Sequence, residues 1–309
     1  MIKRATQTAK WIVPVVVAVF IGRSIVTNWS QVREAEWALE PGWLALSFIL
    51  CSGWYWARPM GWSVALNGFG RPVPFRPLFR LYRRAEMSRF VPGAVWQFVS
   101  RVYLIKRWGV APAACLAATL IDFVLAMLAA VPLAALRLAD ALPMMRGYLL
   151  WAFVVFPFGA LAVVHPKILN FWAGFTAKIL KQPYQKLDIS WARLGGVWLM
   201  YALAWAGWAF GAACFVRGVV RIDAGDIPIV ASSYALSWLS AMLTMISPAG
   251  MGIREALLGL LLEPVLPRGA ALTVAVGIRL WMTFCEVVWT LVGEHLARAV
   301  DPPTAEEPC

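Results

Sequence analysis

The sequence predicts an all-α, polytopic integral membrane protein with about six full transmembrane helices, two re-entrant helical hairpins and an inverted repeat. Three observations predict this class. First, the 309 residues are 61% hydrophobic and only 14% charged, whereas about a quarter of a soluble domain is charged. Second, long apolar runs recur along the chain, and two of them are interrupted by Pro and Gly. Third, Lys and Arg concentrate in particular connections, as they do in cytoplasmic loops. The 18 Trp fit interfacial belts.

Six apolar runs are long enough to cross a bilayer, which takes about 20 residues. They are Trp11–Thr27, Gly42–Leu66, Pro112–Leu136, Gly147–Val164, Arg193–Phe215 and Ala270–Leu296. The first run follows basic residues and lacks a small-residue cleavage site, so we interpret it as an uncleaved signal anchor. Residues 1–309 then form a single integral membrane domain that ends in a tail at 301–309.

The distribution of charge predicts the orientation in the membrane. The N-terminus is basic, as are the connections Arg71–Arg89 and Lys167–Arg193, whereas the intervening loops are acidic or balanced. This alternation requires each interrupted region to enter and leave on one side. We therefore expect a hairpin over Pro74–Trp108 from the cytoplasm and one over Pro228–Leu266 from outside, with both termini cytoplasmic. Alternatively, the first part of the second region is long enough to cross by itself.

The net charge of +12 is explained by this pattern. Basic loops set topology and contact anionic lipid, so the charge does not indicate nucleic-acid binding.

The two interruptions have the same form. They read Phe90-Val91-Pro92-Gly93-Ala94-Val95-Trp96-Gln97 and Ser247-Pro248-Ala249-Gly250-Met251-Gly252-Ile253-Arg254-Glu255. A broken helix in a bilayer leaves backbone groups without partners, so it is tolerated only inside protein or beside a wet cavity. Matching breaks in two halves point to a transport site. We place the hairpin tips at Pro92, Gly93, Pro248, Gly250 and Gly252.

The same parity predicts an inverted repeat. Each half, about 1–140 and about 141–300, reads helix, helix, hairpin, helix, and three crossings per half invert the second half. Alignment on the breaks places Asp122 opposite Arg279, each about ten residues into its helix. Lone charges at that depth are costly unless they are paired or line a wet cavity. Arg279 is expected either to meet a lipid phosphate with Asp122 as its counter-ion, or to form a structural salt bridge with it.

Further charged residues cluster near the breaks. Arg254 and Glu255 follow the second break, where a helix N-terminus favours phosphate or carboxylate; alternatively they form a cap. Glu286 lies seven residues after Arg279 on the same helix face. In the first hairpin, Gln97 and Arg101 share a face and form a second cationic port, or else lie at headgroup level.

Other arginines are assigned to the membrane surface. Arg58, before Pro59, is expected to snorkel to the interface. Arg76, Arg80, Arg83 and Arg84 resemble a basic amphipathic face that binds anionic headgroups, with Phe75, Phe79 and Leu81 toward the acyl region.

Neither the cysteines nor the histidines show metal-ligand spacing, and we expect no metal, no cofactor and no catalytic set. The cysteines are Cys51, Cys115, Cys214, Cys285 and Cys309. His165 and His295 stand near predicted helix ends, which is typical of interfacial histidines.

The residues around both breaks resemble a known family. The first region holds Arg89-Phe90-Val91-Pro92-Gly93-Ala94-Val95-Trp96, Ser100-Arg101 and Lys106-Arg107-Trp108-Gly109-Val110. It resembles the "PG-x-x-W … GR … R-x-G-V" pattern of the lysylphosphatidylglycerol synthase transmembrane-region family. The second break resembles that family's "PGG-x-G-x-RE" pattern, and Leu120-Ile121-Asp122 and Ile278-Arg279-Leu280 follow in order. Ala249 and Ser100 stand where the family has Gly, and we expect these replacements to tighten or reshape the hairpin turns.

The resemblance implies lipid translocation without synthesis, because the family's synthase activity belongs to a separate soluble domain. We expect a flippase in the bacterial inner membrane for an anionic phospholipid, an aminoacyl-phospholipid or an isoprenoid-linked lipid. Arg101, Arg254, Arg279 and Gln97 would bind the headgroup, and Asp122, Glu255 and Glu286 would couple or gate. The alternative is an intramembrane enzyme or an accessory subunit of a lipid or polyprenyl-glycan pathway. The expected partners are membrane lipids, with a second copy of the chain or a lipid synthase as further candidates.

Overall fold

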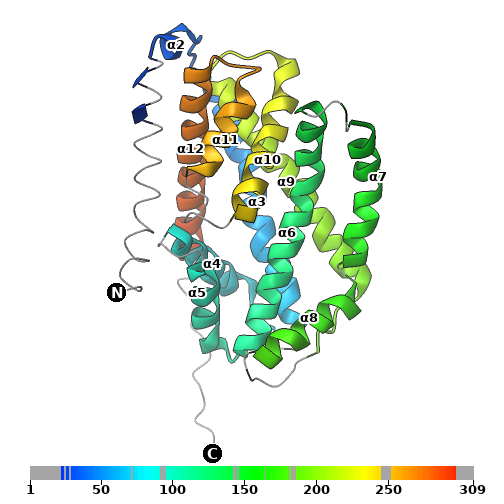
Figure 1. The fold of residues 1–309 in the computed structure, drawn as a ribbon. Helices are drawn as coiled ribbons and strands as arrows, with labels where there is room; N and C mark the ends of the chain where they lie inside the picture. Colours follow the sequence, from blue (N-terminus) through cyan, green and yellow to red (C-terminus); the bar gives the residue numbers. More distant parts are fainter. Residues whose placement is uncertain are drawn as a thin grey trace, which may run out of the picture.

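The computed structural model describes residues 22–23, 26–27, 29–70, 72–90, 95–141, 144, 146–163, 165–179, 181, 186–244 and 252–296. These residues form an elongated bundle of helices with short connections (Figure 1). The α-helices are α2 (Trp29–Glu34), α3 (Pro41–Asn67), α4 (Phe75–Met87), α5 (Trp96–Ile105), α6 (Pro112–Ala141), α7 (Arg146–Val163), α8 (Pro166–Ile179), α9 (Trp191–Val219), α10 (Ile227–Thr244), α11 (Ile253–Leu262) and α12 (Arg268–Leu296). Short 3₁₀ turns follow α4 (η1, Ser88–Phe90), follow α5 (η2, Lys106–Trp108) and precede α10 (η4, Ala224–Asp226).

Small residues bring α3 and α9 together in the most extensive helix contact of the described part. A Cβ atom added to Gly211 of α9 would lie 2.6 Å from the Sγ atom of Cys51 and 3.1 Å from the backbone oxygen of Ser47. The Ser47 hydroxyl also donates a 2.6 Å hydrogen bond to the Gly211 carbonyl. In a bilayer the hydrophobic effect does not drive helices together. Small residues such as glycine support their association instead, because they let the two backbones approach closely.

Aromatic rings fill the space where α3, α9 and α10 meet. The ring of Trp54 stacks on that of Trp208 at a centroid distance of 5.2 Å, and Trp205 meets Trp238 edge-on at 4.9 Å. The expectation that the tryptophans form interfacial belts is therefore wrong for this group, because these rings are buried inside the bundle. Amino-acid composition cannot distinguish tryptophans at the membrane interface from tryptophans inside the bundle, since both positions favour a large amphipathic ring.

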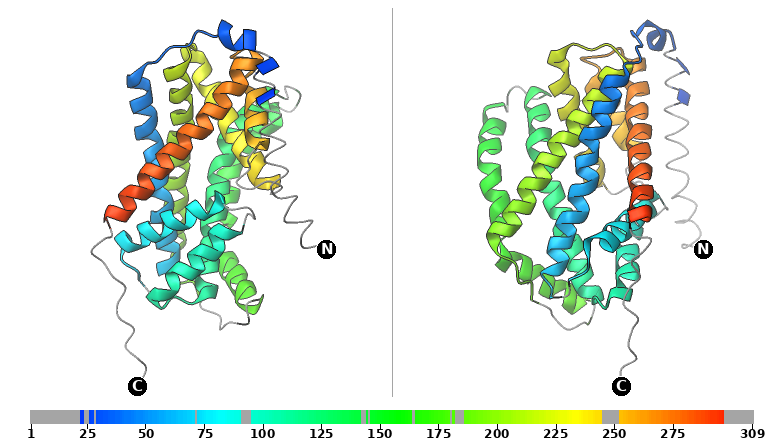
Figure 2. Two further views of the ribbon diagram at one scale, coloured as in Figure 1. Left: turned by 90° about the vertical axis from the view of Figure 1, so that its left-hand side faces the viewer. Right: turned by 180° about the vertical axis from the view of Figure 1, so that it is seen from behind.

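The two interrupted regions lie toward opposite ends of the bundle. Helices α4 and α5, which flank the first break, lie in the part of the bundle toward one end, and α10 and α11, which flank the second, lie in the part toward the other, as the three views show (Figures 1 and 2). Each pair is in contact. Of the expected tips, Gly252 is described; Pro92, Gly93, Pro248 and Gly250 lie outside the described residues. Entry and exit on one side of the membrane stays a prediction.

Three described helices are long and apolar enough to cross a membrane: 112–140, 191–219 and 268–296. They correspond to three of the six expected spans. The expected spans at 42–66 and 147–164 coincide with α3 and α7, which are helical, and most of the span at 11–27 lies outside the described residues. The total of six crossings and the inverted repeat stay predictions.

Helix α8 occupies part of a segment that the charge pattern assigned to a cytoplasmic loop. Leu169, Ala173 and Ala177 are buried and spaced four residues apart, so one face of α8 packs on α6. Aromatic side chains, Phe171 and Trp172 among them, project from the exposed side. An apolar groove of about 490 Å³ runs between α6 and α8. Because the lysines of this segment were interpreted only as topology signals, its amphipathic pattern was not recognised from the sequence.

Candidate functional site

Asp122 of α6 is 1% exposed and accepts hydrogen bonds from four side chains. Arg58 of α3 makes a bidentate pair with it, with Nε 2.9 Å from Oδ1 and Nη2 2.8 Å from Oδ2. Nη1 of Arg101 in α5 lies 2.9 Å from Oδ2, and the Tyr82 hydroxyl lies 3.0 Å from the same oxygen. Tyr201 of α9 donates to Oδ1. Elements separated along the chain are thus joined at one carboxylate.

A continuous chain of ion pairs extends from Asp122 toward α12. Nη2 of Arg101 lies 2.6 Å from Oε1 of Glu86, and Nη1 of Arg89 lies 3.2 Å from Oε2 of the same residue. Arg89 also pairs with Glu286 of α12, whose other oxygen lies 3.3 Å from Nη2 of Arg83. We call these seven residues the buried network: Arg58, Arg83, Glu86, Arg89, Arg101, Asp122 and Glu286.

The charged state of Glu86 follows from its surroundings. Glu86 lies in α4, outside the three helices that could cross a membrane. Burial raises the pKa of its carboxyl, but Arg101 and Arg89 outweigh this effect and lower the pKa to about 2. At neutral pH the network therefore contains an ionised carboxylate at this position.

Local sequence spacing explains how α4 supplies its part of the network. Arg83, Glu86 and Arg89 follow one another at intervals of three, so they lie on one face of α4 and the turn η1. Phe79 and Tyr82, one turn earlier on the same side of the helix, are fully buried. On α3, Gly61 leaves room for Tyr201, because a Cβ atom there would lie 2.3 Å from the Tyr201 hydroxyl.

A small cavity of about 30 Å³ lies beside this network. A volume of that size holds one or two water molecules. Its lining includes three arginines, Arg89, Arg254 and Arg279, on η1, α11 and α12; the others are Tyr55, Trp208, Trp238, Met242, Met282 and Thr283. The cavity is therefore closed around guanidinium groups, with aromatic and sulfur-containing side chains as its walls.

Helix α11 begins at the cavity. Gly252 has a φ of +93°, a conformation open to glycine at little cost, and its N–H donates to Oε2 of Glu255 over 2.6 Å. Oε1 of Glu255 lies 3.7 Å from Nε of Arg279. The guanidinium of Arg254 lies over the rings of Tyr234 and Trp208, at 4.6 and 5.9 Å from their centroids.

The flanks of the two breaks meet at Arg279. The guanidinium of Arg279 lies 5.9 Å from the ring centroid of Phe90, the last described residue before the first break. Its ion-pair partner Glu255 follows the second break directly. One side chain of α12 thus contacts both interrupted regions.

The structure changes the pairing expected from the sequence. Arg254 and Arg279 lie together at the cavity, as expected, but Arg101 does not line it, because its guanidinium is occupied by Asp122 and Glu86. Arg89 takes that place. The pairing of Asp122 with Arg279 is wrong: Asp122 pairs with Arg58 and Arg101.

Four residues assigned to the membrane surface lie inside the protein instead. Arg58 does not snorkel, since Asp122 holds it, and Arg83 is 2% exposed and faces Glu286. Phe79 and Leu81 are buried within the protein rather than turned toward acyl chains. An amphipathic pattern shows which face of α4 is polar but does not tell whether that face meets lipid headgroups or buried carboxylates.

Some residues of the site were not predicted from the sequence. Glu86 belongs to the network, and Tyr82 and Tyr201 are its neighbours through their hydrogen bonds to Asp122. The spacing of Arg83, Glu86 and Arg89 was the sequence feature that could have indicated this part of the site. Gln97 is half-buried one turn before Arg101, and none of the hydrogen bonds given above involves it.

Cys51, Cys115, Cys214 and Cys285 are buried free thiols. Within the described residues, no three His, Cys, Asp or Glu side chains gather as a metal site.

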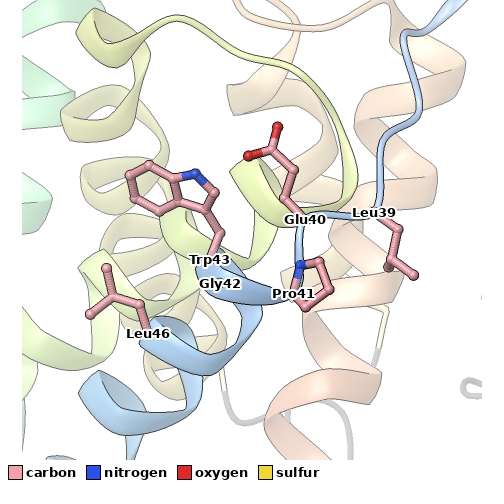
Figure 3. Close-up of a pocket in the computed structure, with 6 residues that line it drawn as sticks. All are labelled: Leu39, Glu40, Pro41, Gly42, Trp43 and Leu46. Atoms are coloured by element: carbon pink, nitrogen blue, oxygen red, sulfur yellow. The ribbon is translucent and has the colours of Figure 1, made fainter.

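A second hollow lies at the start of α3 and is open to the surface (Figure 3). It has a volume of about 510 Å³ and is lined by Leu39, Glu40, Pro41, Gly42, Trp43 and Leu46. Trp43 and Arg58 are separated along α3 by roughly 22 Å at the helical rise of about 1.5 Å per residue. With one carboxylate and no guanidinium, this hollow shares neither the position nor the charge of the network.

Comparison with known proteins gives one family. The sequence profile of the family described as "Lysylphosphatidylglycerol synthase TM region" matches residues 11–289, which includes the whole network and cavity. No curated protein matches the chain at a significant level.

Proposed function

Because the chain belongs to the family of the lysylphosphatidylglycerol synthase TM region, a family of lipid-related membrane proteins, we propose that it translocates a lipid across the membrane. The lipid headgroup would bind at the cavity between Arg89, Arg254 and Arg279, while the acyl or isoprenoid tails stay in the bilayer.

One observation carries this proposal. The flanks of both helix breaks contact Arg279 beside a cavity lined by three arginines, and the helix pairs α4–α5 and α10–α11 extend toward opposite ends of the bundle (Figure 1). Irregular backbone within an apolar chain is expected beside a polar cavity, and discontinuous helices meeting at a central site are typical of transporters. Guanidinium groups favour phosphate because their fork of donors matches its oxygens.

The closed cavity fits one state of an alternating cycle. A volume of about 30 Å³ admits water but excludes a lipid headgroup, so either the α4–α5 side or the α10–α11 side must move to open it. Movement of one pair against the rest of the bundle would open the cavity toward one face of the membrane. The proposal includes a bacterial inner-membrane location with both termini in the cytoplasm, which rests on the charge pattern of the loops.

The test is transport in liposomes that contain the purified protein and fluorescent lipids. Translocation is measured as the fraction of label that a membrane-impermeant quencher reaches with time. Arg254→Ala and Arg279→Ala are expected to slow it by about tenfold or more, because each removes a charged contact worth about 1.5–3 kcal/mol. Arg193→Ala, at an exposed arginine in the first turn of α9, is the matched control and should transport normally.

The outcomes separate the alternatives. Normal rates in both cavity variants would remove the headgroup site. Chemical turnover of headgroups without movement of lipid between leaflets would favour the intramembrane enzyme. Absence of both activities, in vesicles where the folded protein is verified, would favour an accessory subunit.

A further inference from the structure

The buried charges around the cavity do not balance. Among the described residues, the buried network and the cavity together contain six arginines and four carboxylates. The arginines are Arg58, Arg83, Arg89, Arg101, Arg254 and Arg279, and the carboxylates are Glu86, Asp122, Glu255 and Glu286. These described residues therefore carry two more positive than negative charges, in a region largely withdrawn from water, where excess charge is strongly unfavourable.

The excess is located at the cavity. In the network, three carboxylates serve four arginines, and Arg89 is the arginine of that set that also lines the cavity; its side chain is 31% exposed. On the other wall, Glu255 pairs with Arg279, and its second oxygen already accepts the N–H of Gly252. The network thus has a net charge of +1 on the side of the cavity that Arg89 forms, and Arg254 adds a second positive charge on the other wall.

Arg254 shows the unfilled contact most directly. The residue is 6% exposed, and its Nη2 atom has no hydrogen-bond partner in the described part of the chain. The aromatic rings beneath it, Tyr234 and Trp208, supply no formal charge. The Tyr234 hydroxyl is also buried without a partner there. Buried donors without acceptors are rare in folded proteins, so an unpartnered guanidinium nitrogen of a residue that lines a cationic cavity indicates a missing oxygen-rich anion.

From this charge balance we infer that the cavity takes a doubly charged phosphate group, a phosphomonoester or a diphosphate. The inference rests on the proposed function and narrows its substrate. Two negative charges neutralise the two surplus arginine charges, and phosphate oxygens accept bidentate guanidinium bonds. A phosphodiester supplies one charge. An aminoacylated headgroup would bring an ammonium group among three guanidiniums, where like charges repel.

The walls of the cavity can accommodate such a group after opening. Met242 and Met282 line it, and methionine side chains readily change conformation. The donors Arg89, Arg254 and Arg279 come from three different elements, so a bound phosphate would hold η1, α11 and α12 together.

Binding to the purified full-length protein in detergent tests the inference, with tryptophan fluorescence and the unfolding temperature as readouts. The probes are octyl phosphate, dioctyl phosphate and inorganic phosphate. At pH 7.5, octyl phosphate is expected to bind about tenfold or more tightly than dioctyl phosphate. Because a phosphomonoester loses its second proton near pH 6, this preference should disappear at pH 5. Equal affinities at pH 7.5, or a preference that does not change with pH, would overturn the inference.

Variants assign the effect to the cavity. Arg254→Gln should reduce the affinity for octyl phosphate by about tenfold, while Arg193→Gln should leave it unchanged. If Arg254→Gln lowers the unfolding temperature too far for measurement, Arg254→Lys keeps the charge without the guanidinium fork and should show an intermediate loss. An unaltered preference in a folded Arg254 variant would exclude this site.

The probes also separate the sources of the phosphate. Tighter binding of octyl phosphate than of inorganic phosphate identifies a lipid headgroup, whereas equal binding identifies free phosphate. Translocation of phosphodiester lipids without any preference for monoesters would overturn the inference and leave lipid transport standing. Phosphomonoester binding without translocation of any lipid would support the inference and contradict lipid transport.

Discussion

At the scale of single residues, Asp122 is an anchor. A charged residue in the middle of a membrane helix costs about 2.5–3.5 kcal/mol or more, and here two guanidiniums and two hydroxyls surround the carboxylate. Removal of one member of a buried ion pair typically costs about 3–5 kcal/mol. The many partners favour a structural role for Asp122.

The fit of Tyr201 to Asp122 depends on Gly61. A Cβ atom at position 61 would lie within 2.3–2.5 Å of three atoms of the Tyr201 side chain. We expect Gly61→Ala to displace that ring, break its hydrogen bond to Asp122 and destabilise the protein by about 1–3 kcal/mol. The unfolding temperature in detergent measures this.

Gly53→Ala is the matched control for that substitution. It lies in the same helix with nothing within 4 Å of its added Cβ, so alanine should leave stability unchanged or raise it slightly. Equal effects at positions 53 and 61 would show that the contact with Tyr201 carries no stability.

At the scale of elements, one arginine fastens the second interrupted region to the bundle. Arg137 of α6 is 8% exposed; its Nε donates to the Ser233 hydroxyl over 3.0 Å, and its Nη2 donates to the Leu261 carbonyl over 3.0 Å. It thus satisfies a carbonyl at the C-terminal end of α11, which the helix itself leaves without a partner, and joins α6 to α10.

We expect Arg137→Met to destabilise the α10–α11 pair by about 1.5–3 kcal/mol, since charge-assisted hydrogen bonds in a buried site are lost. Amide hydrogen exchange in residues 253–262 should accelerate more than exchange in α3. Arg107→Met, at an exposed arginine, should change neither. Uniform acceleration in all helices would mean that Arg137 supports the whole bundle rather than this pair.

Sequence patterns predicted elements better than contacts between them. Clustered Pro and Gly inside apolar runs predicted the two interruptions, between η1 and α5 and between α10 and α11, whereas the single prolines Pro59 and Pro132 stand inside α3 and α6. The amphipathic helix α8 was missed because Lys167 and Lys178 were interpreted only as topology signals. Its apolar positions, spaced by four, carried the information.

The candidate site was predictable only in part for a related reason. Arg254 and Arg279 were recognisable because a charge within an apolar run needs a partner or a cavity. The identity of each partner depends on tertiary packing: Arg58 and Asp122 are 64 residues apart, and Arg83 and Glu286 are 203 apart. Where arginines outnumber acids, sequence alone leaves several pairings equally acceptable.

At the scale of the whole molecule, α12 links the two interrupted regions. Arg279 reaches Glu255 and the ring of Phe90, Glu286 reaches Arg83 and Arg89, and Glu294 pairs with arginines of α4. Helix α4 also packs closely on α12, because a Cβ atom at Gly293 would lie 3.2 Å from the Phe79 ring. Separation of α4 from α12 would carry Arg89 away from the cavity wall, so these contacts control its opening.

The contact most open to solvent in this set is the one at the end of α12. Nε of Arg80 lies 2.8 Å from Oε2 of Glu294, and Nη2 of Arg84 lies 2.6 Å from the same oxygen, with 47% of the Arg84 side chain exposed. Exposed pairs contribute at most about 1 kcal/mol. If transport requires α4 to leave α12, Glu294→Gln should therefore speed translocation in liposomes by roughly two- to fivefold without loss of fold.

The dependence of the translocation rate on ionic strength tests independently whether the pairs of Arg80 and Arg84 with Glu294 hold α4 against α12. Because screening weakens exposed pairs, raised ionic strength should speed the unmodified protein and leave Glu294→Gln nearly unaffected. Glu263→Gln, at an exposed pair in which Arg268 lies 3.4 Å away, should retain both the original rate and its response to salt. A slower or unchanged rate in Glu294→Gln would mean that the cavity opens elsewhere. The α10–α11 side, held by Arg137, would then be the moving part.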